Sequence, residues 1–205
     1  MKHGAIILLL IMSFGMFSAS ARDAPDFDHY LLNLSWSPEF CYSHATSPEC
    51  SAMPRHGFIV HGLWPEFRNG GGPEYCSHAA GLSNPASMLD IMPDLHLIEH
   101  EWQAHGTCSG LAPDDYFDLI RRAYNAIRIP RQFENPRAQV AISPSDIKKA
   151  FEQANPGLGD ADIVIACDKR FLTAVSLCLS KELKPVACPV ARDCDARMIR
   201  VPPVR

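Results

Sequence analysis

The sequence predicts an α+β fold, in which an antiparallel β-sheet is packed with helices that lie to one side of it. An alternating apolar and polar run at 30–36 indicates a half-buried strand near the start. Segments with helical spacing occupy the middle of the chain, between 84 and 154. Two β-rich runs, 161–167 and 171–179, follow around a short turn and indicate a hairpin. Early and late strands with helices between them are typical of this fold class.

The first 21 residues of the 205 are expected to be a signal peptide rather than part of the fold. A basic start precedes an apolar run from about 5 to 17, and Ala19-Ser20-Ala21 matches the small-residue cleavage pattern. The run is too short for a membrane span, and no later stretch is long enough to be one. Residues 22–205 are therefore predicted to form a single secreted or periplasmic domain.

The first part of this domain is predicted to hold two strands and two loops. The strand at 30–36 ends at a proline, and 41–50 is expected to be a short polar loop. A second strand at 57–61 is expected to stop at Gly62. Residues 66–81 are rich in glycine, and a loop of this length in a compact domain is often a binding loop.

Caps, prolines and helical spacing predict four helices. They are a short helix from Asn84-Pro85, one over about 95–105, one from Pro113 to Pro130 and one from Ser143 to Asn155. Residues 130–142 are expected to be a loop with a short strand, and 181–205 a coil held by disulfides.

All the cysteines follow the predicted cleavage site. They are Cys41, Cys50, Cys76, Cys108, Cys167, Cys178, Cys188 and Cys194. An even count behind a signal peptide predicts four disulfides and an oxidising compartment. The chain has no Cys-x-x-Cys pair, which argues against a zinc ribbon or a thioredoxin-like site.

The charge balance is slightly acidic, with 19 basic against 23 acidic residues and a net charge of −4 at pH 7. A protein that holds duplex nucleic acid by charge alone is normally basic. The composition still permits an enzyme that binds a few nucleotides in a local groove.

The segment 97–108 is the richest in acid and base groups. Asp94 can cap a helix here, and Gly106 suits the C′ position that ends one. At ~100° per residue, Ala104 lies ~40°, Glu101 ~100° and His105 ~140° around the helix from His100. One arc therefore presents two imidazoles with a carboxylate between them, which is a surface suited to proton transfer.

Two other interpretations of this helix remain open. Zinc proteases carry His-Glu-x-x-His, whereas here one more residue separates the histidines, so the rings diverge by ~140° and cannot easily bind one zinc. The other alternative is a solvated helix face whose histidines cap the helix or pair locally.

A second histidine motif, His61-Gly62-Leu63-Trp64-Pro65, lies at a strand end. Gly62 lets the backbone approach a ligand closely, and Trp64 offers a flat face. Taken alone, this motif favours a structural interpretation, in which the histidine is a hydrogen-bonded polar group that lies against an aromatic ring of the core. Combined with the histidine-bearing helix, it favours phosphodiester cleavage by a neighbouring 2′-hydroxyl, which needs a base, an acid and a stabiliser of the phosphorane. An aromatic ring beside such a site can stack a nucleobase, at roughly 1–3 kcal/mol.

At this point the chain resembles the ribonuclease T2 family. The first family motif matches as Phe58-Ile59-Val60-His61-Gly62-Leu63-Trp64-Pro65, and the second as His100-Glu101-Trp102-Gln103-Ala104-His105-Gly106-Thr107-Cys108. The likeness extends from 30–41 to 177–179 and Cys188. It implies endonucleolytic cleavage of single-stranded RNA, through a 2′,3′-cyclic phosphate, to a 3′-phosphate. It implies no metal or other cofactor, and we expect a monomer without a membrane partner.

The resemblance also assigns the catalytic groups. It makes His61 the general acid and His105 the base, although these two roles could be exchanged. It implies that Glu101 supports the phosphorane and that His100 binds phosphate.

Base contacts and disulfides follow from the same resemblance. Trp64 would stack the base at the cleavage site, and Glu66 takes the place of an acidic residue that often reads it. The implied disulfides are Cys76–Cys108, Cys167–Cys194 and Cys178–Cys188, with Cys41–Cys50 as a local bond. Cys108 would then attach the end of the histidine-bearing helix to the loop around Cys76.

One position departs from the family. The residue before the second catalytic histidine is usually lysine, and here it is Ala104. Loss of one such donor can cost ~10²–10³ in rate. Arg55 or Arg68 could supply a substitute cation, although an exposed arginine is the commoner outcome for either.

Three hypotheses follow. The first is a secreted or periplasmic endoribonuclease. The second, favoured by Ala104, is a weakened or inactive descendant that binds RNA or a partner as an effector. The third is a metallohydrolase.

Overall fold

The computed structural model describes residues 25–51, 53–190 and 192–204. The predicted signal peptide, 1–21, lies outside the described residues. The strands are β1 (His29–Trp36), β2 (Phe58–Glu66), β3 (Val140–Ile142), β4 (Ile163–Asp168), β5 (Phe171–Leu179) and β6 (Ile199–Val201). The helices are α1 (Ser37–Ser43), α2 (Pro48–Ser51), α3 (Leu95–Ala104), α4 (Pro113–Asn125), α5 (Arg131–Glu134) and α6 (Pro144–Ala154). Short 3₁₀ turns lie at Pro85–Met88, Gly106–Cys108 and Asp160–Asp162.

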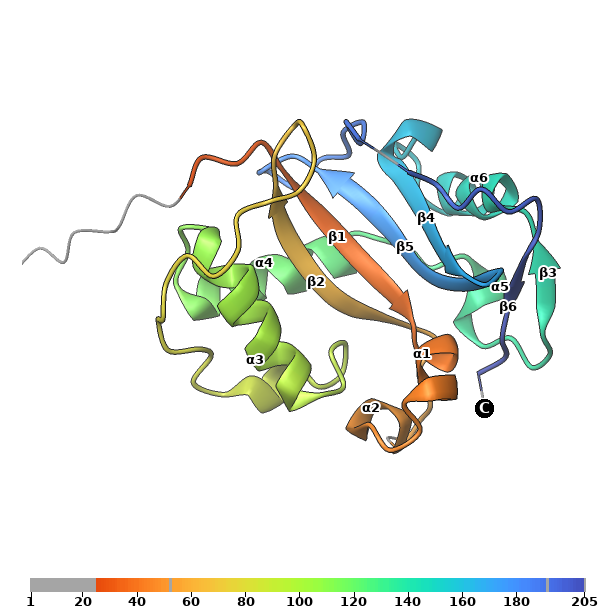
Figure 1. The fold of residues 1–205 in the computed structure, drawn as a ribbon, viewed down its shortest axis with the longest axis horizontal. Coiled ribbons are helices and arrows are strands. Elements are labelled where there is room, and N and C mark those ends of the chain that lie inside the picture. Colours follow the sequence, from red (N-terminus) through yellow and green to blue (C-terminus); the bar gives the residue numbers. More distant parts are fainter. Residues whose placement is uncertain (1–24, 52, 191, 205) are drawn as a thin grey trace, which may run out of the picture.

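The strands form one sheet in the order β2-β1-β5-β6-β3, and β4 pairs with β5 (Figure 1). All pairings are antiparallel except that of β5 with β6, which is parallel. The predicted α+β class is therefore confirmed, with the correction that the sheet is mixed at one pairing. Helix α3 lies beside the edge strand β2.

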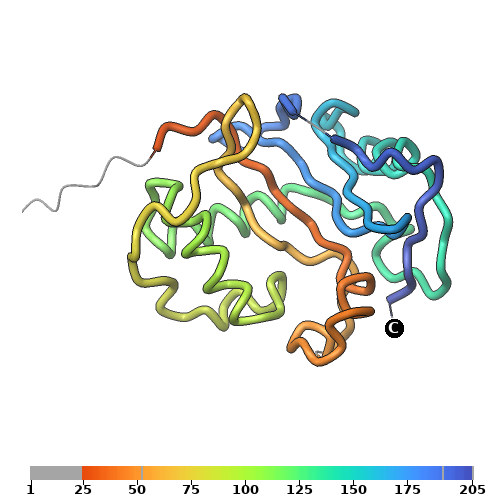
Figure 2. The backbone as a smooth tube through the Cα atoms, in the orientation of Figure 1, coloured from red at the N-terminus to blue at the C-terminus, as the bar shows by residue number. Residues whose placement is uncertain are grey.

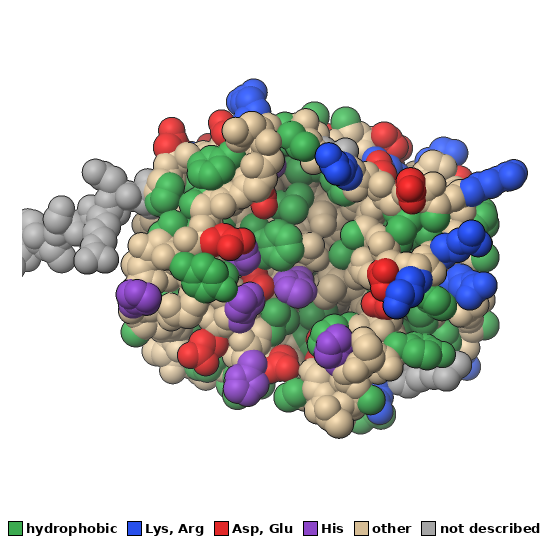
Figure 3. Space-filling model, viewed as in Figure 1, with side chains coloured by type: hydrophobic (Ala, Val, Ile, Leu, Met, Phe, Trp, Pro, Cys, Tyr) green, Lys and Arg blue, Asp and Glu red, His purple; other side chains and the backbone are tan. Residues whose placement is uncertain are grey.

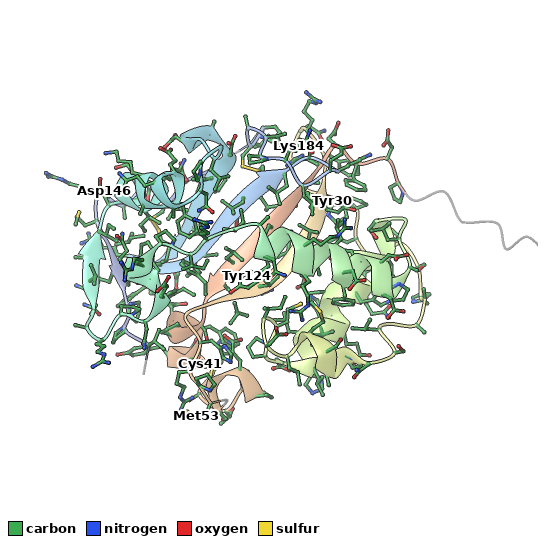
Figure 4. All side chains as sticks on the ribbon, turned by 180° about the vertical axis from the view of Figure 1, so that it is seen from behind. Tyr30, Cys41, Met53, Tyr124, Asp146 and Lys184 are labelled. Atoms are coloured by element: carbon green, nitrogen blue, oxygen red, sulfur yellow. A yellow bond between two sulfur atoms is a disulfide. The ribbon has the colours of Figure 1, made fainter. Side chains whose placement is uncertain are left out.

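The two faces of the sheet differ in burial. On β1, Tyr30, Leu32, Leu34 and Trp36 are almost completely buried, whereas the residues between them are partly exposed. Helix α4 lies across the buried face, as Figure 4 shows from behind, with Tyr124 labelled on it. The alternation predicted from the sequence is thus confirmed, and it leaves the opposite face of the sheet available for a site.

Four predicted segments differ from the structure, and one of them, the expected loop at 130–142, contains the short helix α5 before its strand β3. The expected loop at 41–50 instead contains the end of α1 and most of α2. Strand β2 does not stop at Gly62 but continues to Glu66, because β1 pairs with it along this whole length. The C-terminal coil contains β6, which pairs with β3.

Four disulfides link Cys41–Cys50, Cys76–Cys108, Cys167–Cys194 and Cys178–Cys188. These are the same pairs that the family resemblance implies. Figure 2 shows the loop after β2, in yellow, running around the molecule to α3. This loop is held to the helix because Tyr75 N–H donates to the Ala104 carbonyl at 2.8 Å and Trp102 Nε1 donates to the Ala79 carbonyl at 2.9 Å. Among the described helices, none is both long and apolar enough to cross a bilayer.

Candidate active site

His61 occupies an irregularity in strand β2. Asn33 of β1 pairs with Gly62, but the next residue, Leu34, pairs with Val60. His61 is therefore the extra residue of a β-bulge. Bulges re-aim a side chain and are frequent beside active sites. The bulge also lets the strand place Val60 opposite buried Leu34 and still continue beyond the site.

Gly62 is required by close packing rather than by its backbone angles. A Cβ atom at this position would collide with Glu101 Oε2 and Trp64 Nε1. The glycine thus allows the carboxyl of α3 to lie directly against the strand. The sequence suggested that Gly62 lets the backbone approach a ligand, but in the structure the Glu101 carboxyl and the Trp64 indole occupy the space that a Cβ would fill.

Helix α3 begins and ends near the predicted residues. The Asp94 side chain accepts a hydrogen bond from His96 N–H at 2.8 Å and caps the start. Gly106 follows the C-terminal cap residue, His105, as predicted, but its role is steric, since a Cβ there would collide with Trp102 and Tyr116.

The side chains of both motifs meet around Trp64. Its ring centroid lies 5.7 Å from that of His61 and 5.1 Å from that of His105. Its indole N–H donates to Glu101 Oε2 at 2.7 Å. The other carboxyl oxygen, Oε1, lies 3.4 Å from His61 Nε2 and makes no hydrogen bond to the described residues. Two imidazoles and a carboxyl from different elements therefore share one site.

Burial determines the protonation of these groups. Burial raises the pKa of Glu101 to about 8, despite the opposing hydrogen bond from Trp64. Burial, followed by repulsion from His100 and His61, lowers the pKa of His105 to about 4. Burial and His100 also lower the pKa of His61. Near neutral pH the free site therefore holds a neutral carboxyl and neutral imidazoles.

The remaining predicted residues lie around this cluster. His100 is exposed on α3, and its charge reaches both other imidazoles. Glu66 is half-buried, and burial followed by Glu74 raises its pKa. Ala104 is only 2% exposed. Helical spacing alone could not predict this burial, because the loop around Tyr75 covers the residue.

The suggested substitute cations lie elsewhere. Arg68 pairs with Asp28 through Nε at 3.8 Å, and Arg55 lines a separate cavity beside Pro202. In the part of the chain that the structure describes, no lysine or arginine contributes to the pKa shifts of His61, Glu101 or His105. Figure 3 shows histidine side chains gathered on one half of this face, Lys and Arg mainly on the other half and at the rim, and acidic side chains on both halves.

Sequence reasoning missed one contact that supports the site. Helical spacing identified Tyr116 as a core residue, and it is fully buried. Its hydroxyl also donates to the Leu63 carbonyl at 2.8 Å, which fixes the strand between the bulge and Trp64. An apolar stripe carries no signal for such a bond. The described residues contain no cluster of three or more His, Cys, Asp or Glu side chains arranged to hold a metal.

The buried carboxyl should lower the stability of the fold near neutral pH. The folded-state pKa of Glu101 lies above the ordinary value of 4.5, so the folded state binds more protons than the unfolded state between pH 4.5 and about 8. The free energy of unfolding therefore falls as pH rises through this window. We expect Glu101→Gln to raise it by up to about 3 kcal/mol at pH 7 and to leave it nearly unchanged at pH 4.

Urea denaturation at the two pH values measures this difference. Glu99→Gln, on the exposed side of the same helix, is the matched control and should change stability at neither pH. An equal effect of Glu101→Gln at both pH values would contradict the assigned protonation.

Comparison with known proteins places this site in a family. The profile described as "Ribonuclease T2 family" matches residues 27–188. A protein of Aeromonas hydrophila named "Ribonuclease" is 31% identical over 86% of this chain and 84% of its own length. A "Ribonuclease-like storage protein" of Panax ginseng is 26% identical over 96% and 92%. The solved structure of RNase NT in complex with 5′-AMP is 26% identical, covers 87% of this chain and 99% of its own, and superimposes with a TM-score of 0.65. The chain therefore belongs to the ribonuclease T2 family, and ribonuclease is the enzyme class to which that membership assigns it.

Proposed function

We propose that this protein cleaves single-stranded RNA endonucleolytically by acid–base catalysis between two histidines, without a metal, through a 2′,3′-cyclic phosphate to a 3′-phosphate. The observation that carries the proposal is the shared site, in which the rings of His61 and His105 both lie within 6 Å of the Trp64 ring. Two imidazoles that both lie this close to one ring can reach the same scissile phosphodiester.

In the first step, one imidazole removes the proton of the 2′-hydroxyl, and the resulting oxygen attacks phosphorus. The other imidazole protonates the departing 5′-oxygen. In the second step water replaces the departed oxygen, and the two imidazoles exchange roles. The lower pKa of His105 suits the base of the first step, because the base must be neutral in the free enzyme, and His61 then serves as the acid.

Glu101 would stabilise the phosphorane as a neutral acid. Below its pKa of about 8 the carboxyl carries a proton, and its Oε1 atom has no partner among the described residues. A hydrogen bond from this oxygen to a phosphoryl oxygen would strengthen as negative charge develops there. His100, which is exposed beside the cluster, would bind the phosphate when protonated.

Trp64 has two roles in this proposal. Its N–H holds Glu101 in place, and its partly exposed ring offers a stacking face to a nucleobase. Such a site requires an unpaired base, which supports a single-stranded substrate. Glu66, two residues further along β2, would contact the base edge.

We also propose that the mature domain, 22–205, acts as a monomer in the periplasm or outside the cell. Four disulfides among the described residues support an oxidising compartment.

A second candidate function is a weakened or inactive descendant that binds RNA or a partner. Ala104 supports it, because the cluster then lacks a fixed cation beside the phosphorane. The likeness to a ribonuclease-like storage protein supports it as well.

Product analysis on a dinucleotide tests the reaction. We expect a 2′,3′-cyclic phosphate to accumulate first and a 3′-phosphate to follow. His61→Ala and His105→Ala should each abolish both steps, since each imidazole acts in both. Full activity in the presence of EDTA would exclude the metallohydrolase hypothesis, whereas a 5′-phosphate product would refute the proposed mechanism.

The rate should follow a bell-shaped pH profile with its maximum on the acid side. In the free enzyme kcat/KM should fall below about pH 4, where His105 becomes protonated, and again as pH rises through the lowered pKa of His61. The maximum should therefore lie below pH 6.5. Initial rates on a dinucleotide from pH 3 to 9 measure the profile, and a maximum above pH 7 would contradict it.

Restoring the family lysine tests the second candidate function. We expect Ala104→Lys to cleave RNA up to about 10²-fold faster than Ala104→Met, because a cation beside the phosphorane stabilises it. The methionine variant is the matched control, since its side chain has similar length without charge and must enter the same buried position. Equal rates would show that the required charge comes from elsewhere.

A further inference from the structure

A second cavity opens on the same face of the sheet as the catalytic cluster. Its volume is about 140 Å³, and its walls include His29, Leu31, Glu66, Phe67, Ser176 and Val190. The strand register explains the shared face, because Leu31 is opposite Trp64 and His29 is opposite Glu66. Alternate residues of a strand point to one side, about 7 Å apart. The cavity therefore begins at Glu66, about 7 Å along β2 from Trp64.

His29 carries an unsatisfied group in the wall of this cavity. The residue is 7% exposed, and its Nδ1 makes no hydrogen bond to the described residues. Burial lowers the pKa of His29, with Asp28 raising it and Arg68 lowering it, so the imidazole is neutral at pH 7. A buried polar atom without a partner destabilises the free protein, and a ligand that supplies the missing hydrogen bond recovers that free energy. No hydrogen bond to the described residues fixes the tautomer of this imidazole, so the tautomer with Nδ1 as acceptor is part of the proposal, and the adenosine comparison below tests it.

We propose that His29 and Glu66 together select guanine, by accepting hydrogen bonds from its N1–H and its 2-amino group. The proposal rests on the proposed function, since it names the base that the nuclease reads. Nothing in the family motifs points to His29.

The chemistry of the bases leaves guanine as the match. A carboxylate and a neutral imidazole nitrogen on neighbouring strands present two adjacent acceptors. Guanine offers two adjacent N–H donors on its pairing edge. Adenine and cytosine each place an acceptor nitrogen beside their amino group, and uracil places carbonyls on both sides of its N–H. Each of these would set a lone pair against His29 or Glu66.

The size of the cavity fits insertion of a ring by its edge. The cavity, at about 140 Å³, is slightly smaller than the roughly 150 Å³ that holds benzene, so guanine would enter by its pairing edge and leave the rest of the base at the mouth. Phe67, on one wall, offers an apolar surface, and the loop behind it is closed by Phe67 N–H donating to the Gly71 carbonyl at 2.8 Å.

The test compares guanosine 3′-monophosphate with inosine 3′-monophosphate, which lacks only the 2-amino group. Isothermal titration calorimetry at pH 7 should show guanosine binding about tenfold tighter in the wild type. His29→Phe should reduce this ratio to about one, and His29→Asn, which restores an acceptor, should recover part of it. Glu66→Gln should weaken both ligands, because it removes the charged acceptor of N1–H. Glu74→Gln is the matched control, since Glu74 raises the pKa of Glu66 but is outside the cavity wall, and it should leave the ratio unchanged.

Equal binding of the two nucleotides by the wild type, or an unchanged ratio in a folded His29→Phe protein, would overturn the inference. Tighter binding of the adenosine nucleotide would overturn it as well, because Nδ1 would then carry the proton. The measurement is independent of turnover. A protein that binds guanosine over inosine but cleaves no dinucleotide would refute the proposed function and leave this inference standing.

Discussion

The carboxyl of Glu101, buried between strand β2 and its own helix, is the constraint around which the site is built. It can lie there only because Gly62 has no side chain, and it stays there because Trp64 donates its indole N–H to Oε2 at 2.7 Å. The same hydrogen bond holds the indole ring, whose centroid lies 5.7 Å from that of His61 and 5.1 Å from that of His105. The glycine, the tryptophan and the bulge at His61 therefore act as one unit, and a change at any of them moves the others.

Burial also controls the charge of the site. A carboxyl with its pKa raised to about 8 and an imidazole with its pKa lowered to about 4 are both neutral in the free protein near pH 6. In the proposed mechanism, the positive charge that a phosphorane requires must then come from protons taken up by imidazoles. Where a lysine would supply a fixed cation, this chain has Ala104, so the proposed acid–base catalysis and electrostatic stabilisation would depend on the same groups. This coupling is a physical reason for such a protein to work in acid.

Local patterns were enough to predict much of the fold and to select the two histidine motifs whose side chains meet around Trp64. The alternation in β1, the Asp94 and Ser143 caps and the hairpin of β4 and β5 were all evident, because each depends on near neighbours in sequence. The bulge was not evident, since it depends on register against another strand. For the same reason β2 appeared to end at Gly62. The burial of Ala104 depends on a loop about 30 residues away in the sequence. The pairing of Arg68 with Asp28, which lies just before β1, joins residues that are also far apart in the sequence, so neither feature had a local signal.

The bulge explains how one strand can serve both the core and the candidate site. Before the bulge, Val60 is completely buried opposite Leu34. After the bulge, alternate residues of β2 face the other, less buried side of the sheet. There Gly62 lies opposite Asn33, Trp64 opposite Leu31 and Glu66 opposite His29. A regular strand would give every alternate residue the same side. The extra residue at His61 instead resets the alternation at the point where the imidazole is needed. Groups two residues apart then lie about 7 Å apart along the strand. One edge strand can therefore align the imidazole, the indole and the Glu66 carboxyl along a single extended ligand.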